Sequence, residues 1–354
     1  MAHKAPRWWY ASPGDAEPAR DRLPKILLRP PAWVYGQIAA QRMHRRPSSV
    51  APLPVICVGN FTAGGAGKTP VARLIASRLA ALGKRPGFLS RGYGGQRRGP
   101  HLVDPRKDTA HDVGDEPLLL ARDAPTVISR DRSAGARLLA KQPVDVIVMD
   151  DGLQNPTLAK DLGIAVIDGT RGLGNGAVIP AGPLRAPLVA QRDHVGLVIW
   201  NGTPDGQRLP GEIADLPSLV TTLKPDDTAL ALAGQRVVGF AGIGDPRRFE
   251  RTLDDLGCTV ARFEPFADHH PYTATDLARL SALATRHDAD LVTTEKDMAR
   301  IAIADDRADD PHRGKVRLHC VPVTSVFRDA RDGDQLDHHL QRAIDAFATR
   351  RADD

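Results

Sequence analysis

The chain has 354 residues, of which 42% are apolar and 26% charged, an ordinary composition for a protein with a large buried core and a length that suggests two domains. Its three cysteines are isolated, which argues against a disulfide framework and against a cysteine zinc site. No apolar run approaches the ~18–20 residues of a membrane-spanning helix, and the first 21 residues lack the apolar centre of a signal peptide. We therefore expect the chain to stay in the cytoplasm, which does not place it away from a membrane.

Positive charge is concentrated at the N-terminus. The first 50 residues hold nine basic and three acidic side chains, a net charge of +6, so the remaining 304 residues carry about −1 of the total of +5. Aromatic residues at Trp8–Tyr10 and Trp33 lie among these basic residues, which suits a segment at the interface of an anionic membrane. A helical arm packed on the main domain is an equal alternative, since Pro30 and Pro31 interrupt any long amphipathic helix. No motif supports a nucleic-acid partner.

From residue 53 onward, strand and helix patterns alternate. Strands are expected at residues 55–58, 86–89, 126–128, 144–149, 164–167, 195–200 and 219–223, with helices at 69–82, 116–121 and 133–139. After residue 230 a second series follows, with strands at 237–241, 259–263 and 291–293 and helices at 247–256, 275–287 and 336–349. This alternation predicts an α/β fold, with helices on both faces of a mostly parallel sheet and a smaller C-terminal α/β domain. The expected ranges are an N-terminal arm at 1–50, a core at 51–228 and the smaller domain at 229–354.

A glycine-rich loop, Gly59–Thr69, connects the first expected strand to the first expected helix. Its glycines let successive N–H groups surround phosphate oxygens, and the helix N-terminus adds the positive end of a dipole. Lys68 would reach the phosphates of ATP, and the Thr69 hydroxyl would bind Mg²⁺. The strict G-x-x-x-x-G-K-[ST] pattern is not met, because Thr62 stands at its first glycine position, but strand, GKT and helix together favour phosphate binding over a structural turn. The expected loop residues are Thr62, Ala63, Gly64, Gly65, Ala66, Gly67, Lys68 and Thr69.

Two pairs of neighbouring carboxylates accompany this loop. Asp150 and Asp151 follow a buried apolar strand, where a P-loop fold delivers an Asp to its Mg²⁺ site, although a solvated turn would also carry two acids. Asp115 and Glu116 stand at an expected helix start, where capping explains them as well as catalysis does. Phosphorylation of a hydroxyl needs a group that accepts its proton. The Asp-His-His sequence at residues 268–270 supplies one, forms part of a metal site, or is a surface loop, which these residues alone favour.

Eight short blocks occur in the order found in one enzyme family. They are Val58–Pro70, Ser90–Gly95, Gly114–Pro117, Asp150–Gln154, Asp168–Gly176, Pro180–Arg185, Phe266–His269 and Thr294–Asp297. Taken together they resemble tetraacyldisaccharide 4′-kinase, the lipid A 4′-kinase of Gram-negative bacteria, from about residue 22 to residue 301. The resemblance implies a P-loop NTPase-like core.

The resemblance also implies a peripheral enzyme on the cytoplasmic face of the inner membrane, seated there by its N-terminal segment. It would transfer the γ-phosphate of ATP, with Mg²⁺, to the 4′-hydroxyl of a tetraacylated glucosamine disaccharide 1-phosphate. By the family's motifs, Asp115 would act as the base with His269 as its partner, although His270 is adjacent and the numbering alone does not choose between them. Lys68 would bind the phosphates. The Mg²⁺ site would consist of Thr69, Asp150, Asp151 and Glu116.

Six further side chains are expected to contact the sugar or phosphate of the lipid. They are Arg91, Tyr93, Gln154, Arg171, Asn175 and Arg185. Two departures from the family pattern concern the same part of the sequence. Asn155 stands where the family usually has a titratable His, and Ala186 stands where it usually has a Glu. We expect these changes to affect substrate details or neighbouring contacts and not phosphoryl transfer.

Two other classes of protein also carry phosphate-binding loops. A GTPase or metallochaperone switch should have a guanine-reading Asn/Thr-Lys-x-Asp motif, and in Thr294–Asp297 the Lys and the Asp are adjacent, so the spacing is wrong. A binding protein that has lost turnover should lack part of the machinery, whereas the loop lysine, the hydroxyl and both carboxylate pairs are present. The sequence therefore favours a kinase.

Overall fold

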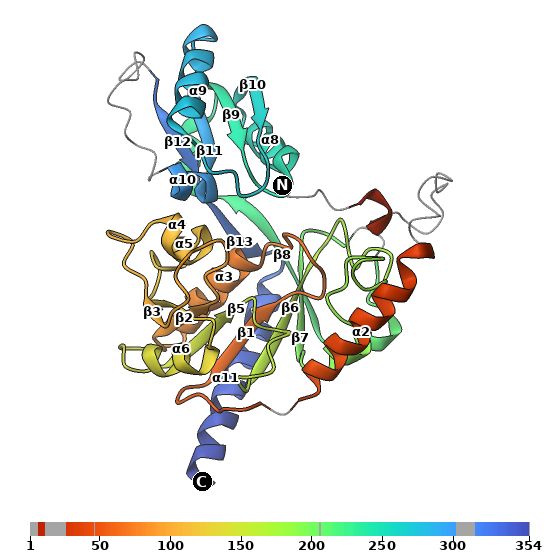
Figure 1. The fold of residues 1–354 in the computed structure, drawn as a ribbon. Coiled ribbons are helices and arrows are strands. Elements are labelled where there is room, and N and C mark those ends of the chain that lie inside the picture. Colours follow the sequence, from red (N-terminus) through yellow and green to blue (C-terminus); the bar gives the residue numbers. More distant parts are fainter. Residues whose placement is uncertain (1–5, 11–25, 46, 205–206, 302–315, 354) are drawn as a thin grey trace.

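The computed structural model describes residues 6–10, 26–45, 47–204, 207–301 and 316–353. Two β-sheets organise these residues, and in Figure 1 the smaller sheet lies above the larger one. The predicted α/β class, with a mostly parallel main sheet and a smaller C-terminal sheet, is confirmed.

The larger sheet has nine strands. They are β1 (Val55–Gly59), β2 (Pro86–Ser90), β3 (His101–Leu102), β4 (Thr126–Ile128), β5 (Val146–Asp150), β6 (Leu162–Asp168), β7 (Leu197–Asn201), β8 (Ser218–Pro225) and β13 (Val323–Phe327). Their order is β13-β8-β7-β6-β1-β5-β2-β4-β3, and only the edge strands β3 and β13 pair antiparallel with their neighbours. Every residue of β1 and β5 is buried, as expected for central strands covered by helices on both faces.

Helices cover both faces of this sheet. They are α3 (Lys68–Ala81), α4 (Ala110–Val113), α5 (Asp115–Leu120), α6 (Arg132–Leu139), α7 (Leu188–Arg192) and α11 (Ala330–Asp353), with 3₁₀ turns η2 (Gly211–Ile213) and η3 (Asp227–Leu232). On one face, Ile75 and Leu79 of α3 share a core with Leu336 and Leu340 of α11. The other face is covered by α6, whose Leu139 packs in a separate core. This arrangement fixes the carboxyl ends of β1 and β5 side by side.

The smaller sheet is parallel throughout. Its strands are β9 (Arg236–Ala241), β10 (Thr259–Pro265), β11 (Asp290–Thr294) and β12 (Leu318–Val321), in the order β10-β9-β11-β12. Its helices are α8 (Pro246–Asp255), α9 (Ala274–Arg286) and α10 (Glu295–Ile301). The capping box formed by Thr273 and Asp276 begins α9.

The chain passes between the sheets twice. It leaves the larger sheet after β8, close to the expected boundary at residues 228–229, and returns after β12 to add β13 beside β8 and α11 beneath the sheet (Figure 1). The expected boundary therefore marks the point where the chain leaves the larger sheet. The end of the range 229–354 does not belong to the smaller sheet, because β13 and α11 pack with the larger one. The expected terminal helix at 336–349 extends over 330–353.

The N-terminal arm contains a 15-residue helix, α2 (Arg29–Met43), preceded by a 3₁₀ turn, η1 (Arg7–Trp9). The expectation that Pro30 and Pro31 interrupt a helix here is wrong. Both prolines lie in the first turn, where backbone N–H groups have no intrahelical partner to lose. Residues 1–5, 11–25 and 46 of the expected arm lie outside the described residues. Within the described ranges, no helix is both long and apolar enough to cross a membrane.

Candidate functional site

The glycine-rich loop turns between β1 and α3 as the sequence predicts. Gly67 precedes the first helical residue, Lys68, with a left-handed φ of +80°. A Cβ at Gly67 would overlap the side-chain amide of Asn201, which donates a hydrogen bond to the Ala66 carbonyl at 3.0 Å. Asn201, from the end of β7, thus fixes the last turn of the loop before the helix. The second polar atom of the Asn201 side chain, Oδ1, is buried with no hydrogen-bond partner among the described residues.

The first half of the loop is held by residues that follow β5 and β6. The N–H of Ala63 donates to the Pro183 carbonyl at 2.7 Å, and Arg185 Nε donates to the Thr62 carbonyl at 3.1 Å. Gln154 Nε2 donates to the Asn60 carbonyl at 2.8 Å. Two side chains expected to contact substrate, Arg185 and Gln154, therefore bind the loop itself.

Asp150 and Asp151 lie at the end of β5, next to the loop. Because Val58 of β1 pairs with Asp150 in register, the strand brings the carboxylates beside the glycine-rich loop that follows β1. Asp151 receives a hydrogen bond from Arg185 Nη1 at 2.6 Å and lies 3.8 Å from Lys68 Nζ. Although burial opposes it, the charges of Lys68 and Arg185 lower the pKa of Asp151.

Asp150 has the opposite electrostatic character. Its side chain is buried, and its Oδ1 has no hydrogen-bond partner in the described part of the chain. Burial first, and then the negative charges of Glu116 and Asp151, raise its pKa to about 7. An orphaned carboxylate oxygen among other acids fits a divalent cation. The described residues contain no three His, Cys, Asp or Glu side chains that could hold a metal alone, so Mg²⁺ would also need the Thr69 hydroxyl, phosphate oxygens and water.

Asp115 begins α5 and is bound from the smaller sheet. Arg300 of α10 binds Asp115 Oδ2 through Nε at 2.9 Å and through Nη2, and His269 Nδ1 lies 3.4 Å from the same oxygen. Burial opposes ionisation, but the hydrogen bond to His269 and the charge of Arg300 lower the pKa of Asp115. The bond to Asp115 raises the pKa of His269. His270 points elsewhere, with Nε2 3.1 Å from Asp276 Oδ2.

A second cation of α10 reaches the larger sheet. Lys296 Nζ binds Glu116 Oε1 at 2.6 Å, and although burial opposes it, the charge of Lys296 lowers the pKa of Glu116. Lys296 and Arg300 are one helical turn apart, so α10 binds both members of the Asp115–Glu116 pair. Neither cation was predicted from the sequence as a site residue, although their i,i+4 spacing directly after a strand was a signal for them.

Most of this chain matches one family of known proteins. Residues 24–344 match the family model described as Tetraacyldisaccharide-1-P 4′-kinase. The chain belongs to this family. It is 52% identical over 303 residues to a tetraacyldisaccharide 4′-kinase of Methylobacterium radiotolerans, covering 84% of this chain and 89% of that one. It is 48% identical over 335 residues to one of Rhodopseudomonas palustris strain BisB18, covering 93% of each.

A solved structure supports the same relationship. The fold resembles the crystal structure of LpxK from Aquifex aeolicus in complex with ATP, with a TM-score of 0.70 and 25% identity. The match covers 90% of this chain and 99% of that one. The resemblance found from the eight sequence blocks is thus confirmed, and the chain is a tetraacyldisaccharide 4′-kinase family member with an ATP-dependent kinase fold.

The other expected substrate residues of this family member have different surroundings. Tyr93 is 69% exposed, and its ring lies edge-on to His269 at 5.8 Å between centroids. Arg91 is exposed in the same loop. The guanidinium of Arg171 pairs with Asp245 at 3.4 Å. Loop 91–93 is therefore near the Asp115–His269 pair, whereas Arg171 is engaged by another protein group.

The two departures from the kinase family pattern are also explained locally. Asn155 Oδ1 accepts hydrogen bonds from the Thr157 N–H at 3.0 Å and from its hydroxyl at 2.7 Å, which closes a turn. Ala186 is fully buried, and its carbonyl accepts a hydrogen bond from Gln191. Neither position presents a titratable group.

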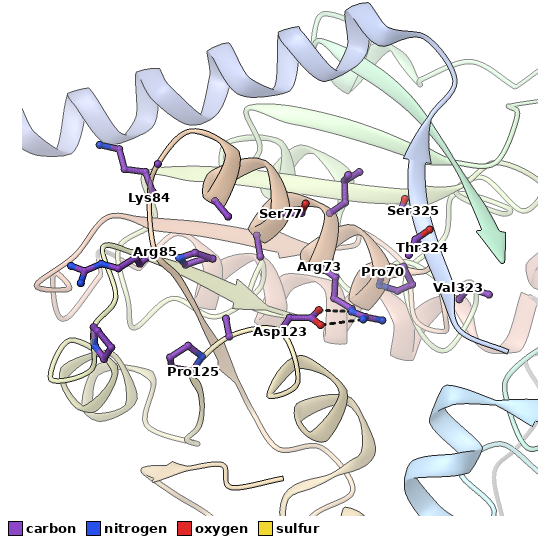
Figure 2. Close-up of a pocket in the computed structure, with 17 residues that line it drawn as sticks. Pro70, Arg73, Ser77, Lys84, Arg85, Asp123, Pro125, Val323, Thr324 and Ser325 are labelled. Atoms are coloured by element: carbon purple, nitrogen blue, oxygen red, sulfur yellow. Dashed lines mark hydrogen bonds and ion pairs between the residues drawn. The ribbon is translucent and has the colours of Figure 1, made fainter. Parts of the chain in front are cut away.

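A separate groove in the described part of this kinase lies away from the candidate site. A groove of about 940 Å³ runs along the outer side of α3, where Arg73 pairs with Asp123 at 2.6 Å (Figure 2). Its lining includes Lys84, Arg85 and Ser325 but none of the predicted site residues. The candidate catalytic residues therefore lie at the carboxyl ends of β1 and β5 and not in this groove.

Proposed function

We propose that this protein transfers the γ-phosphate of ATP, with Mg²⁺, to the 4′-hydroxyl of a tetraacylated glucosamine disaccharide 1-phosphate, giving the 1,4′-bisphosphate. The observation that supports the proposal is that three groups of side chains lie close together. Lys68 of the glycine-rich loop pairs with Asp151, and Glu116, the neighbour of Asp115, is near enough for its charge to raise the pKa of Asp150, while His269 contacts Asp115 from the smaller sheet. Phosphoryl transfer needs these parts together: a phosphate cradle, a cation site and a proton acceptor.

On this proposal, the loop N–H groups and Lys68 bind the β- and γ-phosphates. The carboxylates of Asp150, Asp151 and Glu116, with the hydroxyl of Thr69, would hold Mg²⁺, which would neutralise charge developing on the transferred phosphoryl group. Because Asp151 already contacts Lys68, it also holds the lysine toward the phosphates.

The proton acceptor we propose is Asp115 acting with His269. As the 4′-oxygen attacks phosphorus and the bond from phosphorus to the ADP oxygen breaks, the hydroxyl proton passes to Asp115. The low pKa of Asp115 makes it a weak base by itself, so His269 shares the proton across the 3.4 Å contact. Arg91 and Tyr93 would orient the lipid beside this pair.

We also propose that the protein works as a peripheral enzyme on the cytoplasmic face of the inner membrane, seated by α2. Large apolar side chains of α2 and the residues just before it are exposed, and basic residues lie among them. These exposed residues are Ile26, Leu27, Trp33, Val34, Tyr35 and Ile38. This composition suits insertion into an anionic interface, beside which the lipid acceptor would lie.

The direct experiment is a phosphoryl-transfer assay with radiolabelled ATP and a disaccharide 1-phosphate lipid, resolving mono- from bis-phosphate product. Wild type should form the bisphosphate and consume ATP only when the lipid is present. Lys68→Ala should abolish the reaction, while Lys141→Ala, on the exposed surface, should not. Product formed equally by Lys68→Ala, or faster with GTP than with ATP, would overturn the proposal.

The base assignment has its own test. Asp115→Asn should lower kcat by a factor on the order of 10²–10⁴ and leave ATP affinity little changed, because the amide cannot accept the proton but the phosphate cradle is intact. Steady-state kinetics and ATP binding measure the two effects. Asp145→Asn is the control, because that carboxylate only pairs with Arg85 at the surface. An unchanged kcat removes Asp115 from the base role.

A further inference from the structure

Residues 6–10, which we call the strap, lie against the phosphate-binding loop. The Tyr10 hydroxyl donates a hydrogen bond to the Ala63 carbonyl at 3.2 Å. The same oxygen is the closest atom to the position that a Cβ would take on Gly64, 3.9 Å away. A side chain from the start of the protein therefore contacts the loop where it turns toward the phosphates.

The strap is anchored on the loop that follows β6. The Asn175 backbone N–H donates to the Trp9 carbonyl at 2.7 Å, and its side-chain amide donates to the Trp8 carbonyl at 3.2 Å. The Trp9 indole N–H donates to the Pro180 carbonyl at 3.2 Å. Gly174 has a φ of +63°, and a Cβ there would overlap the Trp9 carbonyl oxygen. The backbone of this loop is thus shaped to receive the strap.

The Tyr10 ring has a second partner. The guanidinium carbon of Arg171 lies 5.6 Å from the ring centroid, a cation–π contact, and Arg171 also pairs with Asp245 at the start of α8. Burial raises the pKa of Tyr10, although Arg171 opposes this, so the hydroxyl keeps its proton and remains a donor. Tyr10 therefore connects the phosphate-binding loop to a side chain that reaches the smaller sheet.

We infer that the strap holds the phosphate-binding loop in the shape that receives ATP, with Tyr10 as a positioning residue. Both backbone groups of Ala63 are fixed, its N–H by Pro183 and its carbonyl by Tyr10, immediately before the flexible Gly64 and Gly65. A loop held in its binding conformation binds more tightly, because apparent affinity falls with the fraction of molecules in the competent state. The strap precedes residues 24–344, the part that matches the family model.

The inference rests on the proposed binding of ATP at this loop, and Tyr10→Phe tests it in the full chain. The variant keeps the ring and loses one neutral hydrogen bond, so the Kd for ATP, measured by equilibrium dialysis, should rise about threefold to tenfold. At saturating ATP the bound phosphates order the loop, so kcat should be unchanged while the KM for ATP rises. Hydrogen exchange at residues 61–67 should become faster.

Two companion variants make the result decisive. Trp9→Phe removes the anchor to Pro180 and should weaken ATP binding in the same direction. Tyr35→Phe changes an exposed tyrosine of α2 and should leave the Kd for ATP unchanged.

The outcomes separate this inference from the proposed function. If Lys68→Ala binds ATP as tightly as wild type, the proposed nucleotide site fails. If Lys68→Ala weakens binding but Tyr10→Phe binds ATP as tightly as wild type, or more tightly, only the strap inference is overturned. A Tyr10→Phe variant with lower kcat and unchanged KM would also overturn it.

Discussion

At the scale of single residues, the ionisation of Asp150 links the candidate site to the stability of the fold. Its pKa is raised to about 7 by burial and by the neighbouring carboxylates, whereas the unfolded chain keeps the ordinary value of ~4. The folded protein therefore binds this proton more tightly than the unfolded chain does. Below pH ~4 the carboxyl is protonated in both states and does not lower the free energy of unfolding. As the pH rises toward and through 7, the free energy of unfolding falls, because the unfolded chain releases this proton more readily than the folded protein does.

Asp150→Asn should therefore raise the melting temperature of the Mg²⁺-free protein relative to wild type, by an amount that grows from pH 5 to pH 8. The amide resembles the protonated acid and cannot ionise. Scanning calorimetry at the two pH values measures the difference. Asp151→Asn is the matched control and should lower the melting temperature at pH 8, because Lys68 and Arg185 favour the ionised Asp151. A less stable Asp150→Asn at pH 8 contradicts the prediction.

The sequence predicted the residues of the site that lie in local patterns. Lys68 and Asp150 could be assigned because a strand, a turn and a helix identify them within a few positions. Arg300 and Asn201 were missed, because their roles depend on contacts with Asp115 and Ala66 that are far away in the sequence. No spacing rule within one segment reveals such contacts.

At the scale of elements, helix α10 supplies Arg300, whose charge lowers the pKa of Asp115. Removing the Arg300 guanidinium should raise the pKa of Asp115, since that charge lowers it now. Arg300→Ala should therefore move the acid limb of the kcat/KM profile to higher pH, with kcat reduced on the order of tenfold or more. A pH–rate profile measures the shift. Arg279→Ala on the exposed side of α9 is the control, and an acid limb at the wild-type pH would refute the prediction.

The helix α2 should determine membrane binding. Trp33 is 67% exposed and Ile38 is 54% exposed, and replacing both with Ser should weaken partitioning onto anionic phosphatidylglycerol vesicles by about tenfold or more. Binding should also fall with added salt, because basic residues supply part of the attraction. Vesicle sedimentation measures both effects, and ATP binding should stay intact. Leu230→Ser, an exposed residue of η3, is the control, and equal partitioning of all three proteins would exclude α2 as the seat.

The strands and helices expected from the sequence agree with the observed ones to within a few residues, because apolar runs such as Val55–Val58 are stable only when buried. The short elements β3, α4, α7 and α10 were not predicted, and the error at α2 has a specific cause. A proline forbids a helix interior but favours its first turn, and the sequence alone did not reveal on which side of Pro30 the helix lies.

At the scale of the whole molecule, the last strand and helix complete the larger sheet. Leu340 of α11 is fully buried in the core beneath that sheet. Leu340→Ala should lower the free energy of unfolding by about 2–5 kcal/mol. Urea unfolding measures the loss, and Leu102→Ala at the sheet's exposed edge should cost much less. Equal effects of the two changes would mean that α11 is only loosely attached.

The sequence did not predict this return. The departure after β8 coincides with the start of the second alternating series of strands and helices, but β12 and β13 were not predicted. Val323–Phe327 reads Val-Thr-Ser-Val-Phe, which does not alternate between apolar and polar residues, so no strand pattern marks it. Its pairing with a strand about one hundred residues earlier is decided by the assembled sheet.

The register of β8 and β13 shows how the smaller sheet is joined to the larger one. Val323 stands directly opposite Pro225 in the antiparallel pair, so the chain enters and leaves the smaller sheet through neighbouring points. Antiparallel partners lie ~5 Å apart, a gap that a two-residue hairpin turn closes. The whole smaller sheet is thus an insertion in a hairpin of the larger sheet. Removing it would leave the glycine-rich loop and the Asp150–Asp151 pair on the larger sheet and would take away His269, Lys296 and Arg300.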